Sequence, residues 1–340
     1  MWGLSGVSAI LGAIAGRKKL EHLQLSEAPN MPFLYWLAVM GAMLKPKWTA
    51  SKKWPALKVS YTAPRKADPQ RLAAFRKLAG WGAGAAGAPG QLPSLFLMAE
   101  GFKLVMSVLT LPAFPVSILG TVVNKKAKYS LLRGVGEGER LLYSARLVPS
   151  VRETFSGHAE FDIVLEAASA DRGDVVWQAV LSLVLMNPKK SKGGHGGKKE
   201  AAEAESGPEA ESLDVWTLPE DTGRRYAALD GDISPMHLYK ATAMLMGFPS
   251  PVANVHLLGA RTEASLAAKK GAAAVAAPFS LDVEFKKPTL LPNKLTLSAA
   301  PGGQGFSEAA AGAEGYRVRV EDKRGKPILV AAARKKAERV

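Results

Sequence analysis

The sequence contains no cysteine. That absence excludes disulfide bonds, catalytic thiolates and thiolate metal sites, while it leaves the redox compartment open. Histidine is scarce as well, and the spacing of the five histidines matches no metal-ligand motif: His22, His158, His195, His237 and His256. Asp232, His237 and His256 could converge on one ion, but no motif supports such a site. The sequence therefore predicts neither a metal nor a cofactor.

Acidic residues are also in short supply, with 30 Asp and Glu against 45 Lys and Arg, which gives a formal net charge of +15. Such a surplus favours anionic partners: nucleic acid, an anionic membrane surface or a phosphate-bearing carrier such as coenzyme A. No basic stretch is interleaved with aromatic side chains of the kind that stack on bases, so we expect no nucleic-acid partner.

The first apolar run is too short to cross a membrane. Residues 1–16 carry no charge and are followed by Arg17, Lys18 and Lys19, whereas a spanning helix needs roughly 20 apolar residues. A secretory signal would carry its positive charge before the apolar run. We therefore expect a cytoplasmic or mitochondrial protein, not a secreted one, in which residues 1–48 pack on the body of the protein or contact a membrane surface.

Two later apolar runs, 33–44 and 92–123, predict buried helices. The second is interrupted by Glu100 and Lys103 and broken by two prolines, which favours a core helix over a membrane span. Residues 45–70 are basic and contain proline, so we expect an irregular connection there.

The chain repeats one scheme on either side of a low-complexity stretch. Residues 189–212 are rich in Lys, Gly and Glu and predict a flexible linker. Before it, apolar residues alternate with acids in 159–166, and 175–186 is a continuous apolar strand. After it, a helical pattern over 255–267 precedes four strand patterns, near 279–285, 294–298, 316–320 and 328–333. A helix followed by antiparallel strands, twice over, predicts an α+β fold.

The candidate chemistry lies just after the linker. Asp232 and His237 are five positions apart, with Gly231 before the acid and Pro235 between the two. Gly, Asp, Ser and Pro favour a turn, so Asp232 is expected on a loop and His237 in the first helical turn after it. That helix is expected to bury a face that includes Leu238, Ala241, Leu245 and Phe248 and to end at Gly247. On spacing alone, the same residues equally indicate a helix N-cap beside a half-buried histidine.

The stretch resembles the signature of the MaoC-like family, the R-specific enoyl-thioester hydratases (hydratase 2) and dehydratases, written Tyr-Ala-x-x-Ser-Gly-Asp-x-Asn-Pro-Ile/Leu-His. The matching residues are Tyr226, Ala227, Gly231, Asp232, Pro235 and His237, whereas Asp230 and Ser234 replace the usual Ser and Asn. Residues 283–288 and Leu291-Pro292 resemble a later strand and turn of that family. The likeness covers roughly residue 31 to the C-terminus and implies a double hotdog fold, in which each half wraps an antiparallel sheet around a long helix.

The resemblance implies a division of the chain and of its site. Residues 1–30 form an apolar and basic extension, 31–188 a divergent non-catalytic hotdog, 189–212 the linker, and 213–340 the catalytic hotdog. Asp232 and His237 would be the catalytic pair. The substrate-binding residues would be Tyr226, Gly231, Ser234, Asn254 and Val255. Asn254 and Val255 stand where the family has His-Gly, so no oxyanion-hole glycine is carried over, and His256 is expected in the core or at the rim.

The implied activity is that of a hydro-lyase in fatty acid metabolism: reversible addition of water to a 2-enoyl thioester of coenzyme A or acyl carrier protein. Three alternatives remain open: a hotdog thioesterase, a non-catalytic acyl-thioester binding protein, and a basic peripheral membrane protein. A double hotdog supplies internally what a single hotdog obtains by dimerising, so we expect a monomer or a homodimer.

Overall fold

The computed structural model describes residues 21–49, 51, 53–82, 90–119, 122–154, 157–187, 210–302, 315–335 and 339. Residues 1–20 lie outside the described residues. So does the predicted linker 189–212, apart from its last three residues, of which Glu211 and Ser212 already belong to a strand.

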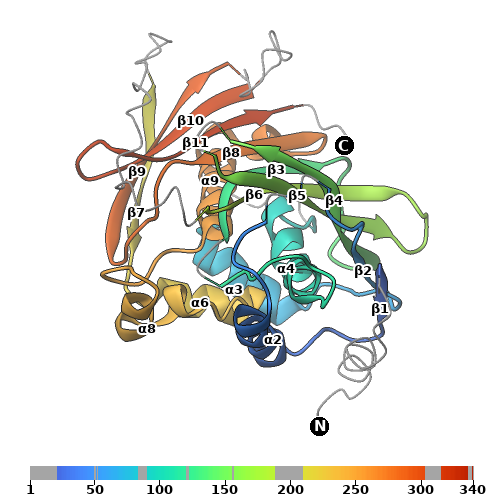
Figure 1. Ribbon diagram of the computed structural model, residues 1–340. Coiled ribbons are helices and arrows are strands. Elements are labelled where there is room, and N and C mark those ends of the chain that lie inside the picture. The colour runs from blue at the N-terminus through green and yellow to red at the C-terminus, as the bar shows by residue number, and fades with distance from the viewer. Residues whose placement is uncertain are drawn as a thin grey trace.

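All the strands of the described chain join one 11-stranded sheet, which forms a curved layer over the helices (Figure 1). Its order is β1-β2-β4-β5-β6-β3-β8-β11-β10-β9-β7. The first half contributes β1 (His22–Leu25), β2 (Lys58–Tyr61), β3 (Val122–Leu131), β4 (Leu141–Glu153), β5 (Ala159–Ser169) and β6 (Val175–Leu185). The second contributes β7 (Glu211–Leu218), β8 (Phe279–Phe285), β9 (Asn293–Pro301), β10 (Gly315–Asp322) and β11 (Pro327–Arg334).

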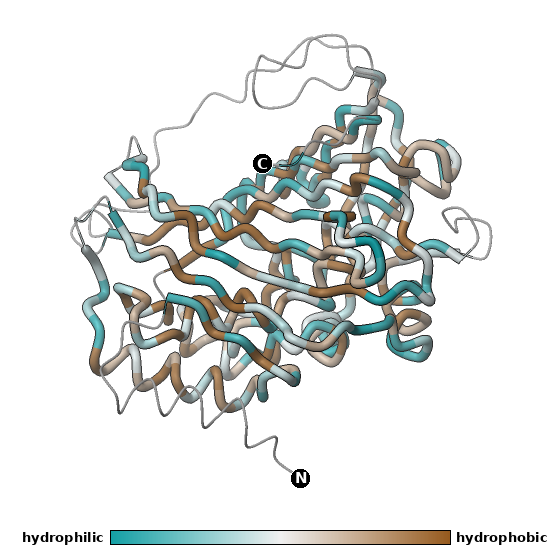
Figure 2. The backbone as a smooth tube through the Cα atoms, turned by 90° about the vertical axis from the view of Figure 1, so that its right-hand side faces the viewer, coloured by the Kyte–Doolittle hydropathy of each residue, from teal (hydrophilic) through white to brown (hydrophobic). Residues whose placement is uncertain are grey.

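The two halves meet where β3 pairs with β8. The pairing is antiparallel and runs from Lys126 opposite Glu284 to Leu131 opposite Phe279. Every other strand pair is also antiparallel except β1 with β2 at the sheet edge. Because the ladder continues across this seam, the halves share one sheet and one hydrophobic core. Figure 2 shows apolar segments running through the strands and through the helices packed on them.

Each half encloses one long helix, α4 (Ser94–Thr110) or α9 (Val255–Lys270), and the two helices contact each other. Almost every residue of α4 is buried, because the sheet covers one side of it and other helices cover the rest. The remaining helices are α2 (Met31–Leu44), α3 (Pro69–Ala79), α6 (Thr222–Asp230), α7 (Pro235–Leu238), α8 (Lys240–Leu245) and the 3₁₀ turn η1 (Ala272–Val275).

The structure confirms the predicted fold class and most of the predicted elements. The alternating and apolar patterns over 159–166 and 175–186 lie in β5 and β6, and the four patterns of the second half are β8 to β11. The apolar run 92–123 holds the buried helix α4. The run 33–44 lies in the helix α2 as expected, but α2 is only partly buried, since Met43 and Leu44 are exposed. Within the described ranges, no helix combines the length and the apolar character needed to cross a bilayer.

Two expectations about elements were wrong. Residues 45–70 contain strand β2, whose four residues are too few for a period to stand out. Strand β1, at the sheet edge, was not predicted. The helix expected after Pro235 is broken at Tyr239, whose extended backbone ends α7, and Leu245 is 87% exposed instead of buried. Ala243 is the buried residue of that segment, so the expected apolar face does not exist.

Candidate active site

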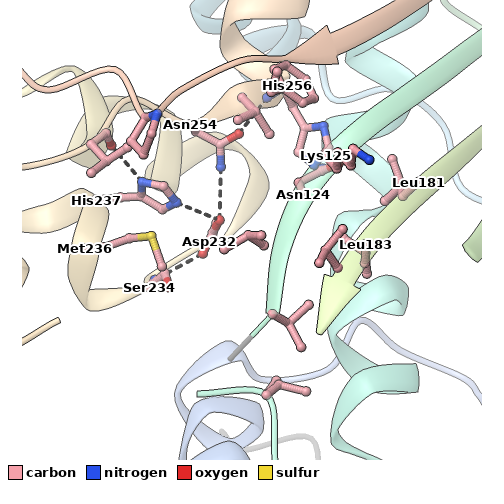
Figure 3. Close-up of a pocket in the computed structure, with 18 of the residues that line it drawn as sticks. Asn124, Lys125, Leu181, Leu183, Asp232, Ser234, Met236, His237, Asn254 and His256 are labelled. Atoms are coloured by element: carbon pink, nitrogen blue, oxygen red, sulfur yellow. Dashed lines mark hydrogen bonds and ion pairs between the residues drawn. The ribbon is translucent and has the colours of Figure 1, made fainter. Parts of the chain in front are cut away.

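A cavity of about 510 Å³ lies between the two halves. One end is polar and is lined by the Asp232 loop, α7 and the start of α9. The opposite wall comes from the first half, and Figure 3 shows β3 and β6 facing the polar end, with Leu181 and Leu183 on β6. The predicted site residues Asp232, Ser234, His237, Asn254 and Val255 all line this cavity.

Asp232 lies on the loop between α6 and α7, as the sequence predicts. Gly231 ends α6 with a left-handed φ of 84°, a conformation that glycine adopts without strain. The turn that follows brings three donors to the carboxylate. The Ser234 N–H donates to Oδ1 at 3.1 Å, the Asn254 amide donates to Oδ2 at 2.9 Å, and the Tyr35 hydroxyl donates to Oδ1. These three donors fix the orientation of the carboxylate.

His237 lies in α7, with one ring nitrogen anchored to the backbone and the other facing the carboxylate. Its Nδ1 lies 2.7 Å from the carbonyl oxygen of Val252. A carbonyl only accepts, so Nδ1 carries the proton and the neutral ring has a lone pair on Nε2. Nε2 is 3.5 Å from Asp232 Oδ2. The backbone N–H of Val252 donates to the Met236 carbonyl at 2.9 Å, so α7 is held to this segment by two bonds.

Asn254 connects the acid to the helix α9. As its N-cap, the side-chain oxygen accepts the N–H of His256 at 2.9 Å, while its amide nitrogen donates to Asp232. The first helical residue is Val255, and no described residue accepts a hydrogen bond from its backbone N–H. An N–H at the start of a helix adds to the positive end of the helix dipole, so this position suits a developing negative charge.

Tyr35 was missed by the sequence analysis. It belongs to α2, 197 positions before Asp232, and no local spacing links the two residues. The signal available in the sequence was only a phenol in an apolar run, which ordinarily indicates core packing.

Two predicted substrate-binding residues, Tyr226 and Gly231, are not among the residues that line the cavity. Tyr226 is fully buried in α6. Gly231 faces Met31 and Lys103, and a Cβ there would come within 2.9 Å of the Met31 side chain. Both residues therefore lie outside the cavity lining, in and at the end of the helix that leads into the Asp232 loop.

Asp230, which replaces the usual Ser, also lies behind the loop. Its Oδ1 accepts the backbone N–H of Asp232 at 2.8 Å, and its side chain is fully buried. Burial, and then the negative charge of Asp232, raise the pKa of the Asp230 carboxyl well above its ordinary value. The enclosed position and the neighbouring carboxylate therefore both disfavour the charged form of Asp230.

His256 has a structural position. It is buried, and its Nδ1 lies 2.8 Å from the hydroxyl of Tyr129. Burial lowers the pKa of His256 to about 4, so the ring stays neutral near pH 7. Within the described residues, no three His, Asp or Glu side chains are grouped as a metal site. His195 lies outside the described residues.

The lysines at the cavity rim have partners within the chain. Lys286 pairs with Glu284 at 2.9 Å and Lys287 with Asp322 at 2.6 Å. Both line the cavity, whereas Lys294 does not. Lys286 is exposed, whereas Lys287 is half-buried.

Comparison with known proteins supports the resemblance. The 3-hydroxyacyl-thioester dehydratase X of Mycobacterium tuberculosis is 27% identical over 239 residues, which cover 70% of this chain and 79% of that protein. Its crystal structure superposes with a TM-score of 0.62 at 23% identity, covering 82% of this chain and 99% of the other. The chain is similar to the MaoC-like dehydratases in sequence and in fold.

Two further solved structures support the same architecture for the chain. A MaoC-like dehydratase from Phytophthora capsici has a TM-score of 0.61 at 14% identity, covering 85% of this chain and 98% of the other. A second Mycobacterium tuberculosis protein, described as a double hotdog, has a TM-score of 0.52 at 11% identity, covering 84% of this chain and 96% of its own. No protein-family model matches the chain. The predicted double hotdog is thereby confirmed.

Proposed function

We propose that the protein is a hydro-lyase that interconverts a 2-enoyl thioester and the R-3-hydroxyacyl thioester. The observation that carries this proposal is the pair of Asp232 and His237, 3.5 Å apart, at the polar end of an otherwise apolar cavity. The similarity to a 3-hydroxyacyl-thioester dehydratase supports the same assignment.

The pair can hold and activate one water molecule. Water placed between His237 Nε2 and Asp232 Oδ2 can donate a hydrogen bond to each, because both atoms are acceptors when the ring is neutral. In hydration, the water oxygen attacks C3 as the pair removes one proton. The π electrons of the C2–C3 double bond move toward the thioester carbonyl, and the pair then returns a proton to C2. Dehydration follows the same steps in reverse.

The start of α9 is suited to hold the thioester oxygen while it carries negative charge. The start of α4 provides an internal comparison, because the N–H groups of Ser94 and Leu95 donate to the Glu263 carboxylate at 2.7 and 3.0 Å. A helix start in this protein thus already binds an oxyanion. At α9 the corresponding N–H of Val255 is left for the substrate.

The first half supplies the wall for the acyl chain. Phe102, Val105, Met106 and Leu109 of α4 line the cavity together with Leu181 and Leu183 of β6. An apolar wall of this kind can bind a hydrocarbon chain, while the polar end of the cavity binds the thioester. We propose an acyl group bound to coenzyme A or to acyl carrier protein as the substrate.

The first test is hydration of a medium-chain trans-2-enoyl-CoA, followed as the loss of conjugated enoyl absorbance. We expect turnover by the wild type and a roughly 10²- to 10⁴-fold lower rate for Asp232→Asn, the cost of removing one acid–base group. Full activity in Asp232→Asn would disprove the role of the pair. Release of free thiol would indicate a thioesterase, and saturable binding without turnover would indicate a binding protein.

We further propose that α2 contributes a peripheral membrane contact. One stripe of this helix leaves Trp36, Val39, Met43 and Leu44 exposed, the last two by 76% and 78%. Met244 and Leu245 of α8 are also exposed, and both helices lie on the side of the molecule away from the sheet (Figure 1). Apolar side chains on a chain of net charge +15 suit an anionic bilayer.

Sedimentation with vesicles tests this contact. We expect the protein to sediment with vesicles that contain phosphatidylserine and the double variant Met43→Ser/Leu44→Ser to remain in the supernatant. The matched control is the double variant Val123→Ser/Val215→Ser, because both valines are exposed apolar residues that lie on the sheet and not on α2. Equal sedimentation of both double variants would exclude α2 as the contact.

A further inference from the structure

We infer that Tyr35 of the first half is a positioning residue for the catalytic carboxylate, so that the half that lacks the acid–base pair still takes part in the chemistry. This inference rests on the proposed hydro-lyase function. The inference is drawn from one hydrogen bond between the two halves, in which the Tyr35 hydroxyl donates to Oδ1 of Asp232.

The helix that carries Tyr35 is anchored firmly enough to position a side chain. The Asn30 side chain caps the start of α2 by accepting the N–H of Phe33, and proline follows at the start of the helix. The residues Met31, Leu34, Leu37 and Ala38 form a buried stripe against the core. Tyr35 is next to this stripe and lines the cavity, where its hydroxyl meets the carboxylate of Asp232.

The contact determines which carboxylate oxygen is free to act. Oδ1 accepts from Tyr35 and from the backbone N–H of Ser234, whereas Oδ2 accepts from Asn254 and faces His237. Two donors on Oδ1 fix the rotation of the carboxyl group and leave one lone pair of Oδ2 directed to the space shared with the imidazole. Burial and the negative charge of Asp232 raise the pKa of Tyr35 far above its ordinary value, so the phenol remains a donor throughout the physiological range.

Removal of the hydroxyl should therefore change kcat and its pH dependence more than substrate binding. In Tyr35→Phe we expect kcat to fall about 10- to 100-fold, the equivalent of one hydrogen bond to a charged group. The acidic limb of the kcat/KM profile should move toward higher pH, because the carboxylate loses a hydrogen-bond donor. KM should change little.

The experiment compares Tyr35→Phe with two controls. Tyr316→Phe removes a hydroxyl from β10, which does not line the cavity, and Trp36→Phe alters the outer face of α2. Both should retain the wild-type kcat and pH profile. A Tyr35→Phe enzyme with a raised KM, an unchanged kcat and an unmoved acidic limb would overturn the inference, since a space-filling phenol would give that result.

A second measurement does not depend on activity. Urea midpoints of wild type, Tyr35→Phe, Asp232→Asn and the double variant form a mutant cycle. We expect the two single losses not to add, because Tyr35→Phe removes the hydrogen bond and Asp232→Asn weakens the same bond by removing the charge of its acceptor. Additive losses would overturn the Tyr35 inference whatever the activity. A non-additive cycle in a protein without hydratase activity would support the contact and refute the proposed function.

Discussion

At the scale of single residues, the position of His237 depends on a glycine, Gly223, which has no side chain. Gly223 in α6 packs directly on the backbone of α7, and a Cβ at this residue would lie 1.9 Å from the carbonyl oxygen of His237. The conflict is with backbone, which cannot rotate away as a flexible side chain can. Glycine is therefore required here by close approach, since its φ is not left-handed.

Gly223→Ala should displace α7 and weaken catalysis. Insertion of a methyl group into a tight contact costs about 1–3 kcal/mol of unfolding free energy, and the shift of His237 away from Asp232 should lower kcat at least tenfold. Both quantities can be measured, by urea unfolding and by the enoyl absorbance assay. Gly138→Ala is the matched control, because a Cβ there meets nothing within 4 Å. A Gly223→Ala enzyme with wild-type kcat would contradict this account.

The sequence could predict Asp232 and His237 but could not predict all of their partners. The pair is close in the chain, and its turn is encoded by Gly231 and Pro235, so local chemistry and family resemblance were enough. Tyr35 is brought to the pair by tertiary packing over 197 positions. Tyr226 and Gly231 belong to the same motif, yet they do not line the cavity. A sequence motif can include residues that hold a loop in place as well as residues that contact the ligand.

At the scale of elements, the two long helices are joined by a buried carboxylate. Glu263 of α9 accepts the first two N–H groups of α4, which suits the positive end of a helix dipole. The same carboxylate is fully enclosed, and this burial raises its pKa to about 7. Its charged form is thus stabilised by the helix and penalised by the loss of water.

The raised pKa predicts a pH dependence of stability. Glu263 binds its proton more tightly in the folded protein than in the unfolded chain, so its contribution is full below pH 4.5 and is lost as the pH rises to about 7. The loss amounts to about 3 kcal/mol for a shift of this size. Glu263→Gln, which cannot ionise, should lose less unfolding free energy between pH 4.5 and 7 than wild type. Parallel curves in urea titrations would contradict the prediction.

The elements that sequence reasoning found are those with a long, uninterrupted period. Strands β8 to β11 are each at least seven residues long, whereas β1 and β2 have four residues each. Helix α3 was not assigned, although its signals are present: the Asp68 cap, Pro69 at the first position and left-handed Gly80 at the end. The prediction of one continuous helix after Pro235 was wrong for another reason. Packing of α7 on α6 overrides the helical pattern of apolar residues in this segment.

At the scale of the whole molecule, the two halves are similar in plan and different in use. Each provides a long helix and a set of antiparallel strands, and the repeated order of these elements could be predicted from the sequence. The seam of β3 with β8 could not, because both strands present similar alternating faces and nothing local selects that partner. The seam determines the site, since it brings the apolar wall of one half opposite the acid–base pair of the other (Figure 3).

This unequal pairing has a consequence for how the protein can evolve. In an assembly of two identical subunits, every substitution occurs in both copies. A substitution that reshapes the acyl wall in one subunit therefore also occurs in the subunit that provides the acid–base residues. Here the wall residues of α4 and β6 and the acid–base residues of the second half are separate positions of one chain. Under the proposed function, selection can therefore alter the preferred acyl group through the first half without changing the acid–base residues of the second. The exception is Tyr35, which contacts Asp232 directly.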